Sequence, residues 1–129
     1  MVNTQTKFKF KSYRVIKSEF TINPNFKSDS ILNVTFSNCR CLENDSEYTL
    51  CIQTSITNNE RSLSVNLEIE GYFEFNKTLQ GVDKENFFKY NAPAILFPYI
   101  RAHISSLTAL CGIEPIVLPT LNFANLLNK

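Results

Sequence analysis

The chain has 129 residues and a mass of 14.8 kDa, so we expect a single domain over residues 1–129 and not a two-domain enzyme. Thirteen Lys and Arg residues against 12 Asp and Glu give a formal charge of +1, which argues against a nucleic-acid partner. The longest apolar run, residues 92–100, is shorter than a bilayer span, so we expect no membrane insertion. Residues 1–11 lack the apolar core of a secretory signal, which predicts a cytoplasmic protein whose four cysteines stay as thiols.

The first strand is predicted over residues 8–22, where apolar residues alternate with polar ones. The alternation shifts by one position near Lys11 and Ser12, and this shift predicts a β-bulge. Residues 24–30 follow and form a connection too long for a tight hairpin. We therefore expect a crossover loop between the first and second strands.

The next three strands are predicted over residues 31–42, 48–56 and 63–75, again from apolar residues at every second position. Residues 43–46 are polar turn formers, so the second and third strands should form a hairpin.

The helices are predicted after residue 80, where apolar residues begin to recur at every third or fourth position. Residues 83–90 predict a short helical segment, and 91–93 interrupt it with a proline. A long helix should follow over residues 95–111, with Gly112 as the left-handed residue that closes it. Asn122 should cap a last short helix. Strands followed by helices define the α+β class.

No catalytic constellation is evident. His103 is the only histidine, and Ser105 and Ser106 lie too close to it along one helix to form a triad. We therefore expect no enzymatic activity and no cofactor. The alternative is a small α+β ligand-binding domain or enzyme with a pocket between sheet and helices, for which Tyr99, Arg101 and His103 are the polar candidates.

The cysteines need separate consideration because three of them fall on the predicted hairpin. Cys39 and Cys41 lie two residues apart on one strand and Cys51 on the next, so a hairpin centred on Asp45 should bring all three to one face. Three thiols can bind zinc, but a fourth ligand and C-x2-C spacing are missing. We expect no metal site and interpret these cysteines as small strand side chains.

Two motifs near the carboxyl end carry a family resemblance. Residues 91–101 read Asn-Ala-Pro-Ala-Ile-Leu-Phe-Pro-Tyr-Ile-Arg, and residues 118–127 read Leu-Pro-Thr-Leu-Asn-Phe-Ala-Asn-Leu-Leu. They resemble the signature of the SecB family of export chaperones, where the stretches read close to N-I-L-F-P-Y-A-R and P-V-N-F-D-A-L-F. Residues 70–75 also resemble the family's G-G-I-F-S-I stretch.

The resemblance implies a four-stranded antiparallel sheet with a crossover loop, backed by a long and a short C-terminal helix. SecB-like proteins are homotetramers, assembled as dimers of dimers, that hold unfolded polypeptides in apolar grooves without ATP. Such a holdase would serve protein export or act as the chaperone of an antitoxin in a toxin-antitoxin pair. The large aromatic content, 11 Phe and five Tyr, agrees with an exposed apolar site for polypeptides.

The resemblance also implies positions for the site. The client-binding groove, assigned by family position, comprises Phe20, Ile22, Phe26, Phe123, Leu126 and Leu127. The amphipathic long helix predicts a tetramer built on Leu96, Ile100, His103, Ile104, Leu107 and Leu110.

The chain departs from the best-known family members at their acidic docking surface. Lys17, Thr21 and Asn66 occupy positions where the family carries the acidic patch that docks on the SecA motor. With the chain ending at Lys129, we also expect no polar tail of the kind that assists this docking. These differences argue against docking on SecA.

Overall fold

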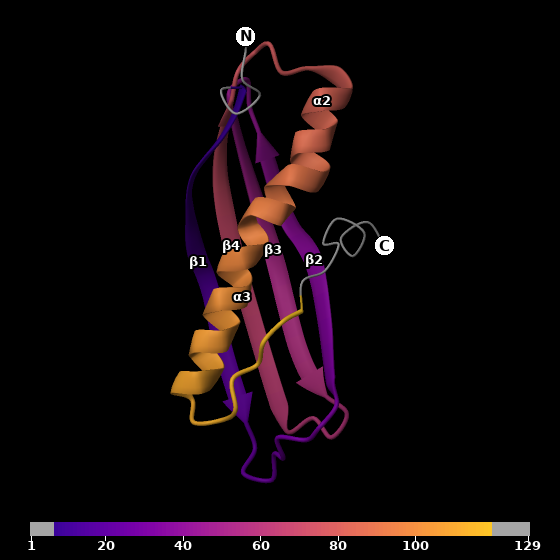
Figure 1. Ribbon diagram of the computed structural model, residues 1–129, viewed down its shortest axis with the longest axis vertical. Coiled ribbons are helices and arrows are strands. Elements are labelled where there is room, and N and C mark those ends of the chain that lie inside the picture. The colour runs from indigo at the N-terminus through magenta and orange to yellow at the C-terminus, as the bar shows by residue number, and fades with distance from the viewer. Residues whose placement is uncertain (1–6, 120–129) are drawn as a thin grey trace.

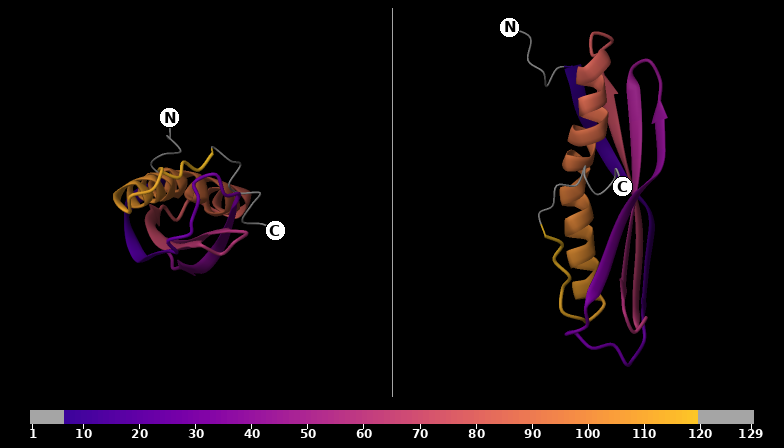
Figure 2. Two further views of the ribbon diagram at one scale, coloured as in Figure 1. Left: turned by 90° about the horizontal axis from the view of Figure 1, so that it is seen from below. Right: turned by 90° about the vertical axis from the view of Figure 1, so that its right-hand side faces the viewer.

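The structure, a computed structural model, describes residues 7–119 and consists of a sheet and a helical rod in two layers (Figures 1 and 2). The elements in chain order are β1 (Phe8–Ile22), β2 (Leu32–Glu43), β3 (Glu47–Asn58), β4 (Leu63–Phe75), α2 (Gly81–Asn86), the π-helical η1 (Phe87–Asn91) and α3 (Ala92–Leu110). We call the sheet face toward the helix the inner face and the opposite one the outer face. The predicted α+β fold is confirmed.

The sheet has the strand order β1-β4-β3-β2, and every neighbouring pair is antiparallel. Consecutive strands β1 and β2 therefore form opposite edges, and the predicted crossover loop joins them at the lower end of Figure 1. The predicted hairpin of β2 and β3 is also confirmed. Its turn is closed by the side chain of Asn44, whose Oδ1 accepts the backbone N–H groups of Ser46 and Glu47.

Strand β1 contains two register shifts against β4. The first, between Phe10 and Ser12, is the predicted bulge; the second lies between Val15 and Lys17. The second shift is visible in the sequence as well, because the apolar positions return to even numbers by Phe20. Together the two bulges keep the apolar residues of a long, twisted edge strand on the inner face.

The core lies between β4, β3 and α3. The inner residues of β4, including Val65, Leu67 and Ile69, are fully buried, as are Leu96 and Ile100 of the helix. A Cβ atom added to Gly71 of β4 would lie 3.0 Å from Leu96 Cδ1. Glycine at this position therefore allows the helix to approach the sheet closely.

The helical rod is continuous, so the interruption predicted at residues 91–93 is wrong. Ala92 has helical dihedral angles (φ −60°, ψ −48°) although it precedes Pro93. The wide turn of η1 comes immediately before this proline. Such a turn moves away the carbonyl group with which a proline ring clashes in an α-helix. The rod therefore passes through Pro93 without a break.

The segment after α3 folds back over the sheet toward β2 (Figure 1). Gly112 is left-handed (φ 84°), as predicted, and residues 113–119 form neither helix nor strand. Ser105 Oγ donates to the Ile116 carbonyl, while the Ile116 N–H donates to Thr108 Oγ1. These bonds fix the segment along α3. The short helix predicted from Asn122 lies outside the described residues.

Candidate functional site

The inner face of β2 is only partly covered. Helix α3 packs on β4, β3 and β1, and it contacts β2 through an edge-to-face pair of Phe97 and Phe36, whose ring centroids are 6.0 Å apart. Leu32, Val34 and Phe36, which we call the β2 stripe, are half-buried, whereas the inner residues of the neighbouring β3 are fully buried or nearly so. The β2 stripe therefore leaves an apolar surface beside the helix.

A cavity of about 280 Å³ adjoins the lower end of the β2 stripe. The crossover loop contributes Phe26 and Ser28, β2 contributes Leu32, and the segment after α3 contributes residues 113–117. The loop is held by a hydrogen bond from the Phe26 N–H to the Asn23 carbonyl (2.9 Å). The cavity is at the small end of the size range for ligand sites, and its walls come from segments that lie far apart in the sequence.

The structure places the predicted groove residues at different locations. Phe26 lines the cavity, whereas Phe20 and Ile22 lie half-buried on the inner face of β1, paired with Val65 and Leu63. Phe123, Leu126 and Leu127 lie outside the described residues. Ile113 and Ile116 also line the cavity, and the β2 stripe lies beside it. We predicted none of these residues in the groove. The sequence does indicate that the β2 stripe is one face of a strand, but not that this strand lies at the edge of the sheet with its inner face half-buried.

The predicted interface residues differ in their exposure. Leu96, Ile100 and Ile104 have no exposed surface, so they complete the core of the protomer. Leu107 is half-buried against that core, and Leu110 is 87% exposed.

His103 is half-buried on α3, and its Nε2 lies 3.0 Å from Ser18 Oγ of β1. Burial lowers the pKa of the imidazole, because the charged form loses its solvation. Nearby, Tyr99 and Tyr13 form a ring pair with centroids 4.3 Å apart. Both tyrosines and Ile16, at the second bulge, remain exposed. The exposed apolar surface on this side of the molecule thus comes from β1 and α3 together.

These contacts bear on the alternative of a pocket between sheet and helices. Tyr99 is engaged with Tyr13, and His103 with Ser18, on the surface of the helix. Arg101 is not among the residues that line the 280 Å³ cavity, and neither are the other two. The wall of this cavity is mixed: it contains apolar side chains, such as Phe26 and Ile116, together with Ser28 and Glu114.

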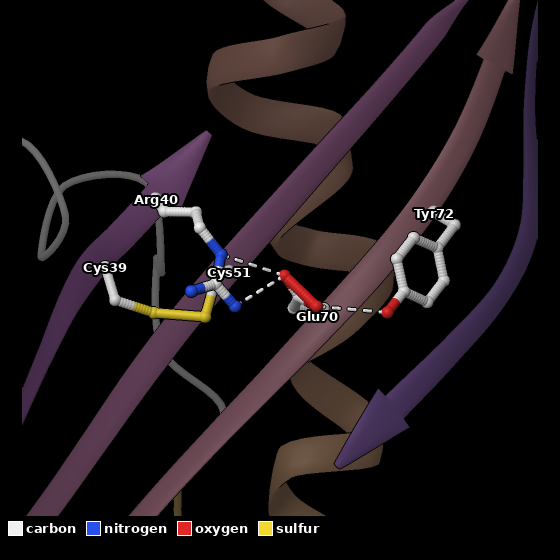
Figure 3. The surroundings of a disulfide bond; sticks show 5 residues. All are labelled: Cys39, Arg40, Cys51, Glu70 and Tyr72. Carbon is white, nitrogen blue, oxygen red and sulfur yellow. Dashed lines mark hydrogen bonds and ion pairs between the residues drawn. A yellow bond between two sulfur atoms is a disulfide. The ribbon is translucent and has the colours of Figure 1, made fainter. Parts of the chain in front are cut away.

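The cysteines depart from our prediction. Cys39 and Cys51 form a disulfide bond on the outer face, with Cα atoms 5.4 Å apart, so the expectation of four free thiols is wrong (Figure 3). The reason is a bulge in β2 between Asn38 and Arg40, which places both Cys39 and Arg40 opposite Cys51. The bulge also sends Cys41 to the inner face, where its sulfur accepts a hydrogen bond from Tyr48 Oη (3.6 Å). The three cysteines therefore do not share one face.

Ion pairs neutralise much of the outer face. Arg40 donates through Nε and Nη2 to Glu70 Oε2 at 3.0 and 2.7 Å, and Tyr72 Oη donates to Oε1 of the same carboxylate (Figure 3). The Glu70 hydrogen bond and charge raise the pKa of Arg40. Glu74 pairs with Lys11 and Glu19 with Lys17, each at 3.0 Å. Three of the carboxylates on this face are therefore paired within the protomer.

Two kinds of site are not found in the part of the chain that the structure describes. Residues 7–119 contain no group of three His, Cys, Asp or Glu side chains able to hold a metal ion. None of the helices in this range is long and apolar enough to cross a membrane.

The geometry defines an α+β protein with one helix-covered sheet, an apolar edge stripe and an adjoining cavity. Comparison with known proteins places the chain in a family: it belongs to the SecB family, whose model, described as preprotein translocase subunit SecB, matches residues 10–129. The chain is 33% identical to the uncharacterized protein MJ0357 of Methanocaldococcus jannaschii, over 92% of this chain and 81% of the relative.

A solved structure is similar in fold. It is the Mycobacterium tuberculosis SecB-like chaperone Rv1957 in complex with a ChAD peptide from the HigA1 antitoxin Rv1956. The TM-score is 0.75, with 15% sequence identity and coverage of 92% of each chain. At this level of identity the match establishes the fold, and it confirms the SecB-like architecture expected from the sequence motifs.

Proposed function

We propose that the protein is an ATP-independent holdase chaperone that binds non-native polypeptides at the β2 stripe and the adjoining cavity. The observation that carries this proposal is the β2 stripe, whose side chains pack against the core on one side and yet stay half-buried, so that part of their apolar surface remains exposed. Membership of the SecB family and the fold shared with a SecB-like chaperone support the same function. No chemical step is required.

The mechanism follows from the shape of the surface. Non-native chains expose apolar side chains every few residues, and a long surface with several weak contacts holds them because each contact raises the effective concentration of the next. Such a surface binds the unfolded client and not the native one, so it delays folding in proportion to its occupancy. Sequence specificity is low because most contacts on this surface are apolar, and apolar contacts discriminate poorly between apolar side chains.

We propose a tetramer, assembled as a dimer of dimers, that uses the exposed side of β1 and α3. The apolar residues available there are Tyr13, Ile16, Tyr99 and Leu110. They replace the buried members of the predicted interface, which serve the core of the protomer. Light scattering should give a tetramer mass at micromolar concentration. A stable monomer would count against this assembly.

The client is proposed to be a dedicated cytoplasmic partner, such as an antitoxin, in preference to precursors for export. Paired carboxylates on the outer face, including Glu70 and Glu74, leave little acidic surface for docking on SecA. The antitoxin peptide bound to Rv1957 supports this choice. The test is to titrate the protein with SecA and with a synthetic peptide taken from an antitoxin; binding to SecA alone would reverse the assignment.

The proposed site is tested by a matched pair of substitutions. Phe26→Ala removes a ring that lines the cavity, whereas Phe20→Ala removes an equally half-buried ring from β1. We expect Phe26→Ala to weaken binding of an unfolded client by roughly 1 to 2 kcal/mol, and Phe20→Ala to lower stability without this loss. Delay of client refolding and thermal unfolding are measured on both. Equal losses of binding would contradict the assignment.

A further inference from the structure

The Cys39–Cys51 disulfide joins two cysteines that have different surroundings. Cys39 is exposed and lies on the edge strand β2, in the bulge between Asn38 and Arg40. Cys51 lies on the central strand β3 and has no exposed surface. A thiolate can attack only the sulfur that it reaches. A dissolved thiol therefore has access to the bond at Cys39 and not at Cys51.

An ion pair covers Cys51 on the outer face. Cys51 is paired with Arg40 of β2 on one side and with Glu70 of β4 on the other, and these two charged residues bind each other. The side chain of Arg40 therefore crosses β3 at Cys51 (Figure 3). The hydrogen bond from Tyr72 holds the other oxygen of the Glu70 carboxylate. This arrangement shields the sulfur of Cys51 and leaves that of Cys39 open.

The end of β2 beyond the bulge has few other contacts. Residues 39–43 are all exposed, so burial contributes little to holding them. Beyond the ladder with β3, the segment is tied chiefly by two ion pairs at the surface, Arg40 with Glu70 and Glu43 with Lys84 of α2. Ion pairs at the surface are weak and are screened by salt. The disulfide is therefore the strongest link between this segment and the rest of the sheet.

We propose that the Cys39–Cys51 bond is a thiol–disulfide exchange site for low-molecular-weight thiols, and that its reduction releases residues 39–43 from β3. The proposal goes beyond the holdase function and does not depend on it. An exposed disulfide is of the labile, regulatory kind, whereas structural disulfides resist small thiols. The site is thus a point at which the redox state of the surroundings changes the structure of the hairpin.

The exchange takes place in two steps. A thiolate attacks Cys39 Sγ and forms a mixed disulfide, while the bond to Cys51 breaks and its electron pair leaves with the Cys51 sulfur, which takes up a proton. A second thiolate then attacks the sulfur of the bound small thiol, and Cys39 leaves as a thiolate that is protonated in turn. Two small thiols supply the two electrons and two protons, and they are oxidised to their own disulfide.

The first test measures how fast glutathione opens the bond in the folded protein, by alkylation and mass analysis of acid-quenched samples. In urea well below the unfolding transition, we expect the rate to change by less than about twofold, because the attacked sulfur is accessible without unfolding. A bond that opens only in the unfolded chain would be reduced in proportion to the unfolded fraction. A rise of about tenfold or more over the same urea range would overturn the proposal.

The second test identifies the attacked sulfur. Tryptic cleavage after Arg40 separates Cys39 from Cys41 and Cys51, so the position of the first glutathione adduct can be mapped. We expect at least about tenfold more adduct on Cys39 than on Cys51, and equal amounts would contradict the proposed access. Cys41→Ser is the matched control, because it removes the neighbouring free thiol and keeps the bond. Loss of the Cys39 adduct in this variant would assign the exchange to Cys41 and overturn the proposal.

The third test compares amide exchange in the oxidised and reduced proteins. After reduction, residues 39–43 should exchange at least about tenfold faster, and salt should increase the rate further because it weakens the two ion pairs. This exchange should not depend on urea below the transition, which is the mark of local opening. Cys39→Ser should behave as the reduced protein does, and Cys41→Ser as the oxidised one. Equal exchange in the two redox states, or an increase only through global unfolding, would overturn the release of the segment.

Discussion

Strands β4 and β2 have the same alternating sequence pattern but different surroundings. Every second residue of β4 from Leu63 to Phe75 is buried beneath the helix, whereas the corresponding residues of β2 are half-buried in its lower part and exposed above. Val34 of β2 and Val65 of β4 allow a direct comparison, because both are paired with Ile56 of β3, one on each side. A valine is therefore fully buried in the core at position 65 but half-buried at the surface at position 34.

The comparison shows what an apolar alternation means in this fold. It determines which residues of a strand share a face, and the strand order determines whether that face is covered. α3 packs chiefly on the central strands β4 and β3 and also on β1, and β2 lies outside its main contacts. The inner residues of β2 therefore pack at the margin of the core and stay half-buried.

The largest expected effect comes from exchanging these two valines for alanine. Val65→Ala removes two methyl groups from a fully buried position and should destabilise the protein by about 2 to 3 kcal/mol. Val34→Ala removes the same groups from a half-buried position and should cost below about 1 kcal/mol, while weakening client binding. Denaturant unfolding and client titration are measured on both variants. Equal destabilisation would mean that β2 is part of the core after all.

The second prediction concerns what holds β2 in place, since burial contributes little there. The Cys39–Cys51 disulfide closes a loop with a sequence separation of 12 residues. Cys39→Ser should lower the free energy of unfolding by about 2 kcal/mol. Cys41→Ser is the matched control, because it changes an exposed thiol on the same strand outside the bond. Identical unfolding curves for the two variants, or for oxidised and reduced protein, would contradict a stabilising disulfide.

The order of elements, the first bulge, the crossover loop and the hairpin could be predicted because each depends on local patterns. The continuity of the helix at Pro93 could not be predicted from the sequence, because it depends on the wide π-helical turn of η1. The Cys39–Cys51 bond was missed because a bulge at Cys39 changes which residues face each other. In the proposed site, the loop position of Phe26 could be predicted from the sequence, whereas the half-buried inner face of β2 depends on strand order and helix position, which alternation does not encode.

The third prediction concerns the boundary between the buried strand β3 and the half-buried edge strand β2. Thr54 of β3 is paired with Phe36 on one side and Leu67 on the other, and its Oγ1 is buried without a hydrogen-bond partner. Thr54→Val keeps the shape and removes the unsatisfied hydroxyl, so it should stabilise the protein by about 1 kcal/mol. Thr57→Val, at an exposed position of the same strand, should change stability by less than about 0.5 kcal/mol. A loss of stability in Thr54→Val would show that the hydroxyl has a partner.

The smallest expected effect distinguishes the edge strand β1, which contacts α3 through His103, from the other edge strand, β2, by its pH dependence. His103 of α3 contacts Ser18 of β1, and burial lowers the pKa of the imidazole below its ordinary value of 6.5. Between these two pKa values the unfolded chain binds a proton that the folded chain does not, so stability falls as the pH is lowered below about 6.5. The control is His103→Gln, which keeps a hydrogen-bonding side chain that does not titrate. Subtracting the unfolding free energies of this variant from those of the wild type removes the contribution of the carboxylates.

The wild-type protein should lose more stability than the variant between about pH 7 and pH 5.5. Amide exchange should become faster in β1 near Ser18 and should not change in residues 32–38 of β2. Parallel pH profiles for the two proteins would show that His103 titrates alike in the folded and unfolded chains, and the contact with Ser18 would then carry no pH-dependent stability.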